Sequence, residues 1–401
     1  MLTRFHVKNF LCLKDVDVDL GPLNIFIGPN SSGKSALFKA LGTVSRLLRY
    51  PLRGDASGDF NVEPGITFDD AVWCGDTQLP IIFELWFDNN EDDTPDYYLE
   101  LRRGYPGWSV VSEKFMFGGR RIDTGVEGFK MPTLNGEPRI LSGPFRATLA
   151  FLTYHGLTNP KIAPYLEPIR KIREQVGQAR RYRPSPSDIS QFVKPMVVKG
   201  ITRNTTVDEN GRGFAIELQN TWKADRPTFD TIQKELCKLH PHITALDFQV
   251  DWRGTGILYK TNRVAFGTPA SLESDGVLLT TFLLWRLYTS PINFKLCLEE
   301  PENGVHVASL GQRYQSLKHS LESFGNSKGV QILVSTHSRD LLNAIDSRPN
   351  ILSEVRVVEF APDTGTKIYN LNHWRQIDQL LDETRNQIGD LWWSNRLASH
   401  T

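Results

Sequence analysis

The sequence predicts an α/β fold in which parallel strands carry a phosphate-binding loop at their carboxyl ends. Three apolar runs support this prediction, because each has the length of a buried strand and ends in polar residues suited to phosphate chemistry. These runs are Leu23–Ile27, Phe294–Leu298 and Val330–Val334. With 401 residues, of which 40% are hydrophobic, the chain can form one large or two ordinary domains around a well-buried core.

The first run leads into a glycine-rich loop, Gly28-Pro29-Asn30-Ser31-Ser32-Gly33-Lys34-Ser35, and apolar residues at helical spacing then continue to Leu48. Glycines let the backbone turn so that successive N–H groups and the helix N-terminus face an anion. In this pattern the Lys34 ammonium reaches the outer phosphates and the Ser35 hydroxyl ligates Mg²⁺. A glycine-rich turn that only opens a helix is the alternative. The strand before the loop and the helix after it favour a site for a nucleoside triphosphate with Mg²⁺.

Two adjacent glutamates, Glu299 and Glu300, follow the second run, and Pro301 ends the strand. The carboxyl ends of parallel strands meet at one edge of a sheet, so these carboxylates are expected beside the phosphate loop. Neighbouring side chains on a strand point to opposite faces, and the pair can serve one site only if the backbone bends there. We expect Glu299 to hold the metal, through water, and Glu300 to orient and deprotonate an attacking water. Without the phosphate loop, the segment would be interpreted as a buried strand leaving the core through an acidic turn.

Two further motifs suit the same chemistry. Ser274-Asp275-Gly276 opens an apolar helix over 277–287, and its free N–H groups suit a phosphate. The third apolar run leads to Ser335-Thr336-His337-Ser338, where His337 is placed to hydrogen-bond a γ-phosphate. A lone histidine is more often structural. The order of the motifs along the chain favours the phosphate role here.

The stretch between the phosphate loop and Ser274 predicts added lobes. It has no sustained heptads, so no long coiled coil is expected. Residues 79–117 alternate like antiparallel strands and predict a β-lobe beside the phosphate loop. Residues 156–245 are expected to form a compact, mostly helical insertion, with helices in LEPIRKIREQVGQARR and FDTIQKELCKLH, before strands return at ALDFQVDW, GILYK and RVAF. The expected segments are 1–155, with the loop and β-lobe, 156–245, with the helical insertion, and 246–401, with the remaining motifs.

The chain has 46 basic and 46 acidic residues, so its net charge does not indicate a binding partner. Only a local cluster of charge can do so. Within Lys161–Arg183, seven basic residues face two acidic ones, and Tyr165 and Tyr182 are interleaved. This pattern predicts a contact surface for nucleic acid or an acidic partner. The alternative is a solvated helix face.

No apolar run is long enough to span a bilayer, and the N-terminal residues lack the apolar core of a signal peptide. The four cysteines have no pairing or metal spacing, which predicts a cytoplasmic protein with reduced thiols and no membrane contact. Trp374, Trp392 and Trp393 near the C-terminus are expected to pack back onto the core, with docking onto a partner as the alternative.

Taken in order, the motifs resemble those of the ABC-type ATPases of the SMC/RecF/OLD group. The matching segments are IFIGPNSSGKS (Walker A), SLESDG (a reduced signature), LCLEEPENGVH (Walker B and D-loop) and ILVSTHS (switch histidine). The lead-in RFHVKNFLCLKDVDVDLGPLNIFIGPN also resembles that group, and YRPSPSDIS, NGRGFAIELQN and KLHPHITALDF resemble segments of its stand-alone RecF-like members. The resemblance spans nearly the whole chain. It implies an ABC-type P-loop NTPase core with an antiparallel β-lobe and a compact helical insertion.

The resemblance also implies a role for each motif. ATP and Mg²⁺ would be the ligands, with Lys34, Glu300 and His337 as catalytic residues. The loop Gly28–Ser35 would bind ATP, and Ser35 and Glu299 would bind Mg²⁺. Ser274, Asp275 and Gly276 would contact the ATP held by a second subunit, which implies a homodimer or a higher homo-oligomer. Gln78 is a candidate for the glutamine loop, and an ordinary turn residue is the alternative.

The sequence departs from the common pattern of these ATPases at two motifs, and both departures indicate which members of the group it resembles. Glu299 stands where transporters and most SMC proteins carry aspartate, which suits the phage-defence members. The short Ser-Asp-Gly signature speaks against a third interpretation, a transporter ATPase subunit. The resemblance therefore implies an ATPase switch that regulates a separate nuclease or toxin in phage defence. Only 64 residues follow His337. These are too few for the nuclease domain of OLD-type nucleases, so we expect the effector to be encoded separately. The alternative is a RecF-like repair ATPase that binds DNA through Lys161–Arg183.

Overall fold

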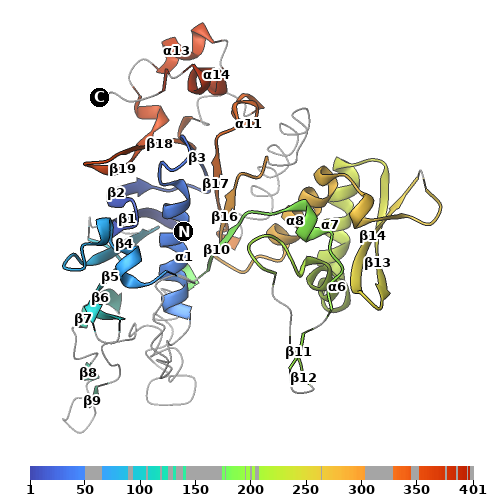
Figure 1. Cartoon of the computed structure of the whole chain (residues 1–401), viewed down its shortest axis with the longest axis horizontal. Coiled ribbons are helices and arrows are strands. Elements are labelled where there is room, and N and C mark those ends of the chain that lie inside the picture. Colours follow the sequence, from blue (N-terminus) through green and yellow to red (C-terminus); the bar gives the residue numbers. More distant parts are fainter. Residues whose placement is uncertain are drawn as a thin grey trace.

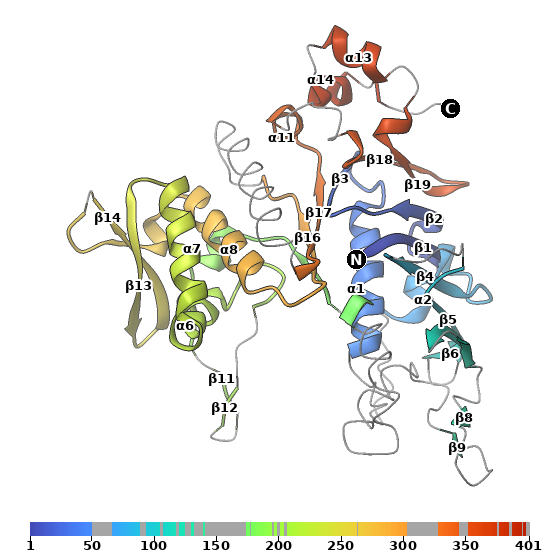
Figure 2. The same ribbon diagram turned by 180° about the vertical axis from the view of Figure 1, so that it is seen from behind.

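The computed structural model describes residues 1–49, 66–88, 94–124, 130–131, 139–140, 174–302, 328–344 and 352–397, with short gaps inside the longer ranges. The described parts form a two-sheet core with a helix between the sheets, and a lobe of helices and strands projects to one side (Figure 1). Seen from behind, the lobe still stands beside the core and is joined to it near β10 and β16 (Figure 2).

The central sheet has the strand order β10-β16-β17-β3-β18-β19. Its neighbours are parallel except for the antiparallel hairpin β18–β19. The strands are β3 (Leu23–Ile27), β10 (Ala179–Tyr182), β16 (Lys295–Glu299), β17 (Gln331–Thr336), β18 (Val355–Ala361) and β19 (Gly365–Asn370). Every residue of β3, β16 and β17 is buried, because both faces of the sheet are covered. The parallel sheet predicted from three apolar runs is confirmed.

The second sheet is antiparallel, with the order β2-β1-β4-β5-β6-β7. Its strands are β1 (Leu2–Phe10), β2 (Leu13–Asp19), β4 (Ile81–Phe87), β5 (Tyr97–Gly104), β6 (Gly107–Phe117) and β7 (Arg120–Thr124), and the separate pair β8 (Lys130–Met131) and β9 (Arg139–Ile140) lies beyond it. Alternate residues of β4 and β5 are buried, as a half-covered sheet requires. The antiparallel strands predicted over residues 79–117 are confirmed.

Helix α1 (Lys34–Arg49) follows the phosphate loop and lies between the two sheets (Figure 1). Its buried side chains belong to one apolar cluster that includes Leu37 and Phe38 of α1, Phe83 of β4 and Leu333 of β17. Because this helix contacts both sheets, it holds the phosphate loop in a fixed position relative to them. The helix predicted from apolar spacing is confirmed.

The projecting lobe is built around α8 (Asp275–Tyr288), in which every residue from Val277 to Tyr288 is buried. Phe282 of α8 packs edge-on against Tyr182 of β10 and Phe214 of α6, so the lobe and the central sheet share an aromatic contact. The other elements of the lobe are α5 (Pro186–Ile189), β11 (Met196–Val198), β12 (Ile201–Arg203), α6 (Phe214–Ala224), α7 (Arg226–Leu239), β13 (Ile243–Asp251), β14 (Gly254–Thr261) and β15 (Thr268–Pro269).

Two predictions in this region need correction. In the segment LEPIRKIREQVGQARR, predicted to be helical, the residues up to Arg173 lie outside the described ranges and 174–176 are helical, but Ala179–Tyr182 is an edge strand paired with β16. It is a strand because Ala179 and Tyr182 are buried while the backbone of β16 needs a partner. The run RVAF was predicted to be a strand, but 264–266 form a turn, with Phe266 86% exposed. The helix in FDTIQKELCKLH is confirmed as α7, and the division into three segments stays a prediction.

The C-terminal part adds α11 (Arg339–Ala344), α13 (Ile377–Glu383) and α14 (Ile388–Trp393) at one end of the central sheet (Figure 1). Trp374 is buried in the main apolar cluster, and Trp392 is half-buried against it, as expected for tryptophans that pack back onto the core. Trp393 is 70% exposed. None of the helices in the described ranges combines the length and hydropathy needed to cross a bilayer.

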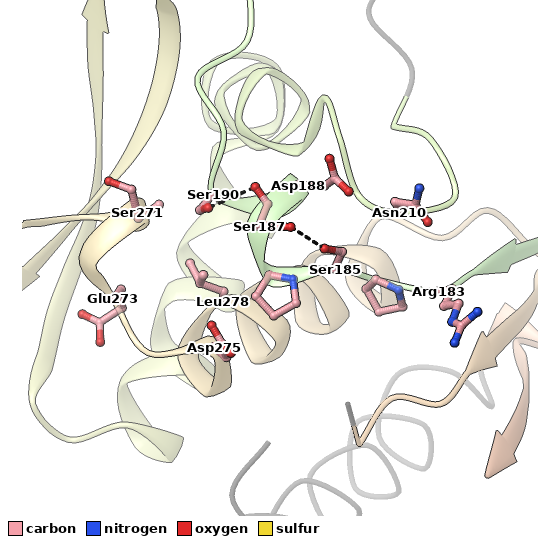
Figure 3. A pocket seen from close by; sticks show the side chains of 13 residues that line it. Arg183, Ser185, Ser187, Asp188, Ser190, Asn210, Ser271, Glu273, Asp275 and Leu278 are labelled. Atoms are coloured by element: carbon pink, nitrogen blue, oxygen red, sulfur yellow. Dashed lines mark hydrogen bonds between the residues drawn. The ribbon is translucent and has the colours of Figure 1, made fainter. Parts of the chain in front are cut away.

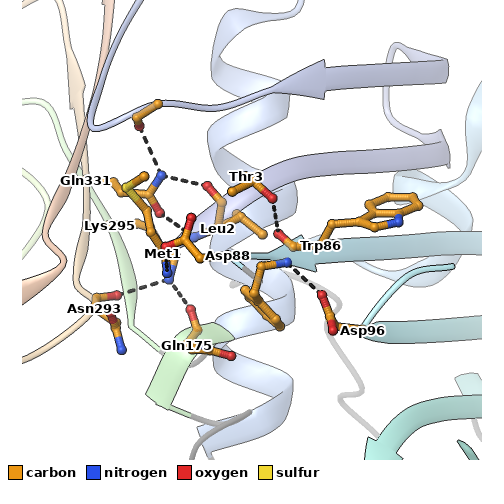
Figure 4. Close-up of polar contacts among 12 residues, drawn as sticks. Met1, Leu2, Thr3, Trp86, Asp88, Asp96, Gln175, Asn293, Lys295 and Gln331 are labelled. Atoms are coloured by element: carbon orange, nitrogen blue, oxygen red, sulfur yellow. Dashed lines mark hydrogen bonds and ion pairs between the residues drawn. The ribbon is translucent and has the colours of Figure 1, made fainter. Parts of the chain in front are cut away.

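Polar contacts join the two sheets at the amino-terminal ends of β1 and β17 (Figure 4). The Gln331 amide donates to the Leu2 carbonyl at 2.8 Å and accepts from the Leu2 N–H at 3.0 Å. Nearby, Lys295 at the start of β16 is buried, and its ammonium donates to the carbonyl oxygens of Asn293 and Gln175. Burial lowers the pKa of Lys295 to about 7. These contacts fix β16 and β17 at the ends opposite to the phosphate loop.

His6 of β1 makes the stability of the second sheet depend on pH. Its ring nitrogens lie 2.6 Å from Glu84 Oε2 and 2.6 Å from Asp15 Oδ1. Burial lowers the pKa of His6, but the hydrogen bonds to Glu84 and Asp15 outweigh it and leave the pKa above its ordinary value. The stabilisation is therefore complete below the unfolded-state pKa of about 6.5 and is lost as pH rises through the higher folded-state pKa.

We expect His6→Gln to lower the melting temperature clearly near about pH 5.5, and the difference should shrink as the pH is raised toward about 8.5, because His6 loses its stabilising proton as the pH passes through its folded-state pKa. Thermal melts of the two proteins across this range check the prediction. A difference in melting temperature that grows toward high pH would contradict it.

Candidate functional site

A cavity of about 490 Å³ opens at the carboxyl ends of β3, β16 and β17. Its lining brings together the phosphate loop and both predicted glutamates. The lining residues are Cys12, Asn30, Ser31, Ser32, Gly33, Lys34, Ser35, Ala36, Arg183, Glu299, Glu300 and Ser335. Residues far apart in sequence therefore meet at the edge of the sheet where the parallel topology places them.

The phosphate loop has a backbone shape that only certain residues allow. Ser31 and Gly33 have φ values of 64° and 110°. A Cβ on Gly33 would lie 2.2 Å from Thr366 Oγ1, and a Cβ on Gly28 would lie 2.3 Å from the Val358 carbonyl oxygen. Both glycines are required because the β18–β19 hairpin presses against the loop.

Thr366 of β19 is a supporting residue that the sequence did not reveal. Its hydroxyl donates to the Ser32 carbonyl at 2.9 Å, and its side chain is fully buried. No motif marks Thr366. The only sequence signal near it is the turn of Asp363 to Gly365, which identifies a hairpin but not its contact with the loop.

Lys34 is buried, and its ammonium donates to the carbonyl oxygens of Gly28 and Pro29, each at 2.8 Å. Burial lowers its pKa, while the charges of Glu300, Glu299 and Glu302 act in the opposite direction. The ammonium therefore lies at the loop within the field of three carboxylates, whose charge a bound Mg²⁺ would partly offset.

The backbone bends between the two glutamates, as the sequence required. Glu299 is the last residue of β16 and is buried. Glu300 has a φ of 46°, and its N–H donates to the Ser335 carbonyl at 2.9 Å. The left-handed backbone turns the second carboxylate toward the cavity that the first one lines. The side chains of Glu299 and Glu300 can therefore act on one ligand.

Each glutamate is paired with a cation. The Glu299 carboxylate lies 3.5 Å from Arg181 Nη1. The Glu300 carboxylate lies 2.7 Å from Arg183 Nη2 and 3.3 Å from His337 Nδ1. His337 follows β17, where the sequence placed it. Its contact with Glu300 puts it at the site although it does not itself line the cavity.

From the sequence, Arg181 and Arg183 were expected to belong to a basic surface over Lys161–Arg183. The structure places them beside the two glutamates. Arg181 also pairs with Glu209 at 2.5 Å, so its guanidinium has two carboxylate partners, Glu299 and Glu209. The members of the cluster up to Arg173 lie outside the described residues. Arg181 and Arg183 make ion pairs with the two glutamates, and the contact surface over Lys161–Arg183 stays a prediction. Strand pairing causes these ion pairs, because β10 lies next to β16.

Glu302 is a third acidic group at the site for which the sequence gave no role. Its carboxylate accepts a hydrogen bond from the Thr336 hydroxyl, and its other oxygen has no hydrogen-bond partner among the described residues. Burial raises the pKa of this carboxyl. It adds negative charge within reach of Lys34.

Ser274, Asp275 and Gly276 lie apart from this cavity. Ser274 caps α8, and its hydroxyl accepts a hydrogen bond from the Val277 N–H at 3.4 Å. Ser274 and Asp275 are exposed. Asp275 lines a second cavity of about 790 Å³, together with Glu273, Asp188 and the serines in and beside α5 (Figure 3). Arg183 lines both cavities, so the two are neighbours.

The donor set fits Mg²⁺ bound with a nucleotide. Ser35 and Glu299 both line the cavity and offer hard oxygen ligands. Mg²⁺ is commonly held by one or two such groups together with phosphate oxygens and water. Ser32 Oγ is buried without a hydrogen-bond partner among the described residues, which favours a ligand at this loop. No group of three or more His, Cys, Asp or Glu in the described ranges forms a metal site from protein alone.

Gln78 does not reach this site in the described structure. It is exposed in a turn, where its N–H donates to Asp76 Oδ1 at 3.1 Å, and it is not among the residues lining the cavity. The geometry fits the turn interpretation of Gln78 rather than a role at the nucleotide.

Comparison with known proteins agrees with this geometry. Residues 1–91 match the family described as "AAA ATPase domain". Residues 152–343 match the family described as "AAA domain, putative AbiEii toxin, Type IV TA system". Together with the order of the motifs, these two matches support an ABC-type ATPase of the SMC/RecF/OLD group. The two matched ranges include the phosphate loop, Ser274–Gly276, both glutamates and His337.

One curated relative shares a short segment. The OLD nuclease of Thermus scotoductus is 50% identical over 44 residues, which cover 11% of this chain and 8% of that protein. The match therefore spans a small part of the relative's length.

Solved structures of SMC heads are similar to this chain. The SMC head bound to the C-terminal winged-helix domain of ScpA has a TM-score of 0.50 at 14% identity, covering 94% of this chain and 99% of that chain. The Thermotoga maritima SMC head domain gives a TM-score of 0.42 at 14% identity, over 92% of this chain and 98% of that one. The first of these supports the ABC-type ATPase fold.

Proposed function

We propose that this ATPase binds ATP with Mg²⁺ and hydrolyses it between two subunits arranged head to tail. The observation that carries the proposal is the division of the site. One cavity holds the phosphate loop and both glutamates, while Ser274–Gly276 lies outside it at an exposed helix start. A helix N-terminus favours an anion. An exposed one that does not reach its own nucleotide cavity suits the phosphate bound by a second copy.

Within one half of this composite site, each residue has a distinct task. Lys34 would hold the outer phosphates, and Ser35 with Glu299 would hold Mg²⁺, which neutralises charge on the phosphate oxygens. Glu300 would accept the proton of the attacking water, and His337, at 3.3 Å from Glu300, would hydrogen-bond the γ-phosphate. The bend at Glu300 supports this assignment, because it lets adjacent residues serve metal and water separately.

We further propose that the closed and open dimers act as a switch for a separate effector, a nuclease or a toxin, in phage defence. The segment shared with an OLD nuclease and the match to a family named for an AbiEii toxin support this part of the proposal. ATP turnover and mass in solution, measured for variants of Lys34 and Glu300, test the ATPase and the dimer. Purification of the native complex tests for an effector.

A RecF-like ATPase that binds DNA is the second candidate, and the basic residues of Lys161–Arg183 favour it. Arg181 and Arg183 are already paired with carboxylates at the cavity, so DNA binding would depend on the remaining members. If the candidate holds, the isolated protein binds DNA with strong salt dependence. Reversing the charges of Arg170, Lys171 and Arg173 then flattens the slope by about one unit for each phosphate that the variant no longer binds. Fluorescence anisotropy across a salt series measures this. DNA binding that the triple variant leaves unchanged would exclude this surface.

A further inference from the structure

Two arginines, Arg181 in β10 and Arg183 just after it, meet the two glutamates at the end of β16. The parallel register places Arg181 opposite Cys297 and Tyr182 opposite Leu298, so Arg183 comes level with the end of β16. Residues two apart on a strand point to the same face. Arg181 accordingly meets Glu299 at 3.5 Å, and Arg183 meets Glu300 at 2.7 Å. Arg183 is thus the arginine that contacts the proposed general base.

The Glu300 carboxylate is held from both sides. Its Oε2 pairs with Arg183 and its Oε1 lies 3.3 Å from His337 Nδ1. A general base must direct an oxygen at the proton that it removes. A carboxylate fixed between a guanidinium and an imidazole is restrained by both, so a change at either one changes its orientation.

The Arg183 side chain has room to change partner. It is 62% exposed, whereas the Glu300 side chain is 20% exposed. Its backbone, in contrast, is fixed, because the Arg183 N–H donates to the Glu209 carbonyl at 2.8 Å. Arg183 lines the nucleotide cavity and also the second cavity, beside the start of α8. Figure 3 shows that the backbone runs from Arg183 into this second cavity at Ser185. The Arg183 guanidinium therefore lies near the Glu300 carboxylate, the cavity that would hold the phosphates, and the start of α8.

We propose that Arg183 is a positioning residue shared between Glu300 and the γ-phosphate of ATP. The proposal rests on the proposed function. A terminal phosphate offers three acceptor oxygens to the planar guanidinium, in the charge-assisted geometry that arginine prefers. When Arg183 moves to the phosphate, Glu300 keeps its contact with His337 and is released to face the water. Because ADP lacks this phosphate, Arg183 distinguishes ATP from ADP.

The experiment measures binding of Mg²⁺–ATPγS and Mg²⁺–ADP to the full chain by calorimetry, for wild type, Arg183→Ala and Arg183→Lys. Arg212→Ala is the matched control. The Arg212 side chain is 61% exposed and pairs with Asp188, which is 19% exposed, at 3.2 Å in the same region. We expect Arg183→Ala to weaken ATPγS binding about tenfold or more and ADP binding less than about twofold. Arg183→Lys should recover part of the loss, and Arg212→Ala should change neither affinity.

A double-mutant cycle separates sharing from a merely structural role. If Glu300 competes with the phosphate for Arg183, Glu300→Gln should tighten ATPγS binding in the wild-type background and not in the Arg183→Ala background. An unchanged ratio of ATPγS to ADP affinity in Arg183→Ala, with the same melting temperature as wild type, would overturn the proposal. If wild type bound neither ATPγS nor ADP, the proposed function itself would be overturned. Failure of the Arg183 proposal and failure of the proposed function therefore give different results.

Discussion

Glu300→Gln is expected to convert the protein into a stable ATP-bound dimer. The amide keeps the size of the side chain but cannot accept a proton from water, so the chemical step should slow by a factor on the order of 10² or more. Glu299, Ser35 and Lys34 are unchanged, and ATP with Mg²⁺ should still bind. Because ATP then persists between two subunits, light scattering should show the mass rise from 45.5 kDa toward twice that value.

Two further substitutions make this result specific. Glu299→Gln should weaken the Mg²⁺ dependence and give less of the trapped dimer, because it removes a charge on the metal side. Ser274→Arg added to Glu300→Gln should abolish the dimer, since the large side chain would block the approach of α8 to the opposite phosphate. Ser274 is exposed, so the arginine has room, and the cost to folding should be limited to the lost N-cap of α8, about 1 kcal/mol. Normal hydrolysis by Glu300→Gln, or a dimer that forms equally well with Ser274→Arg, would rule out the composite site.

Lys34→Ala should remove most nucleotide binding. The ammonium is the cation at the mouth of the phosphate loop, and charge-assisted hydrogen bonds to phosphate are among the stronger ones in proteins. ATP at about a hundred times its dissociation constant should stabilise wild type by about 2.7 kcal/mol, which is visible as a rise in melting temperature. In Lys34→Ala that rise should nearly disappear.

Lys39→Ala is the control for this result, because Lys39 lies five residues further along α1 and does not line the nucleotide cavity. It should keep the full ATP-dependent rise in melting temperature. A Lys34→Ala protein that hydrolysed ATP like wild type would show that the Walker A assignment is wrong.

The sequence predicted the features of this site that depend on local pattern. The buried strands β3, β16 and β17 are recognisable because both of their faces are apolar, and the phosphate loop because its glycines and Lys34 have fixed spacing. The bend at Glu300 followed from chemistry alone, since adjacent strand residues cannot otherwise share a ligand.

What the sequence missed depends on contacts between distant segments. The stretch QARR carries two adjacent arginines and looks like an exposed helix, yet Ala179–Tyr182 completes the edge of the central sheet. Arg181 and Arg183 become site residues only through that pairing. Thr366 reaches Ser32 across 334 positions of sequence, and no local spacing encodes such a contact.

The contact of the β18–β19 hairpin with the phosphate loop has a consequence for synthesis. Strand β3, which leads into the loop, pairs with β17 on one side and β18 on the other, and both come from the last third of the chain. A nascent chain that ends before Val330 carries the whole phosphate-loop sequence but neither neighbouring strand nor Thr366. Contacts this distant in sequence form late and slowly. A ribosome-bound chain should therefore become able to bind ATP only after the β18–β19 hairpin, Val355–Asn370, has left the exit tunnel.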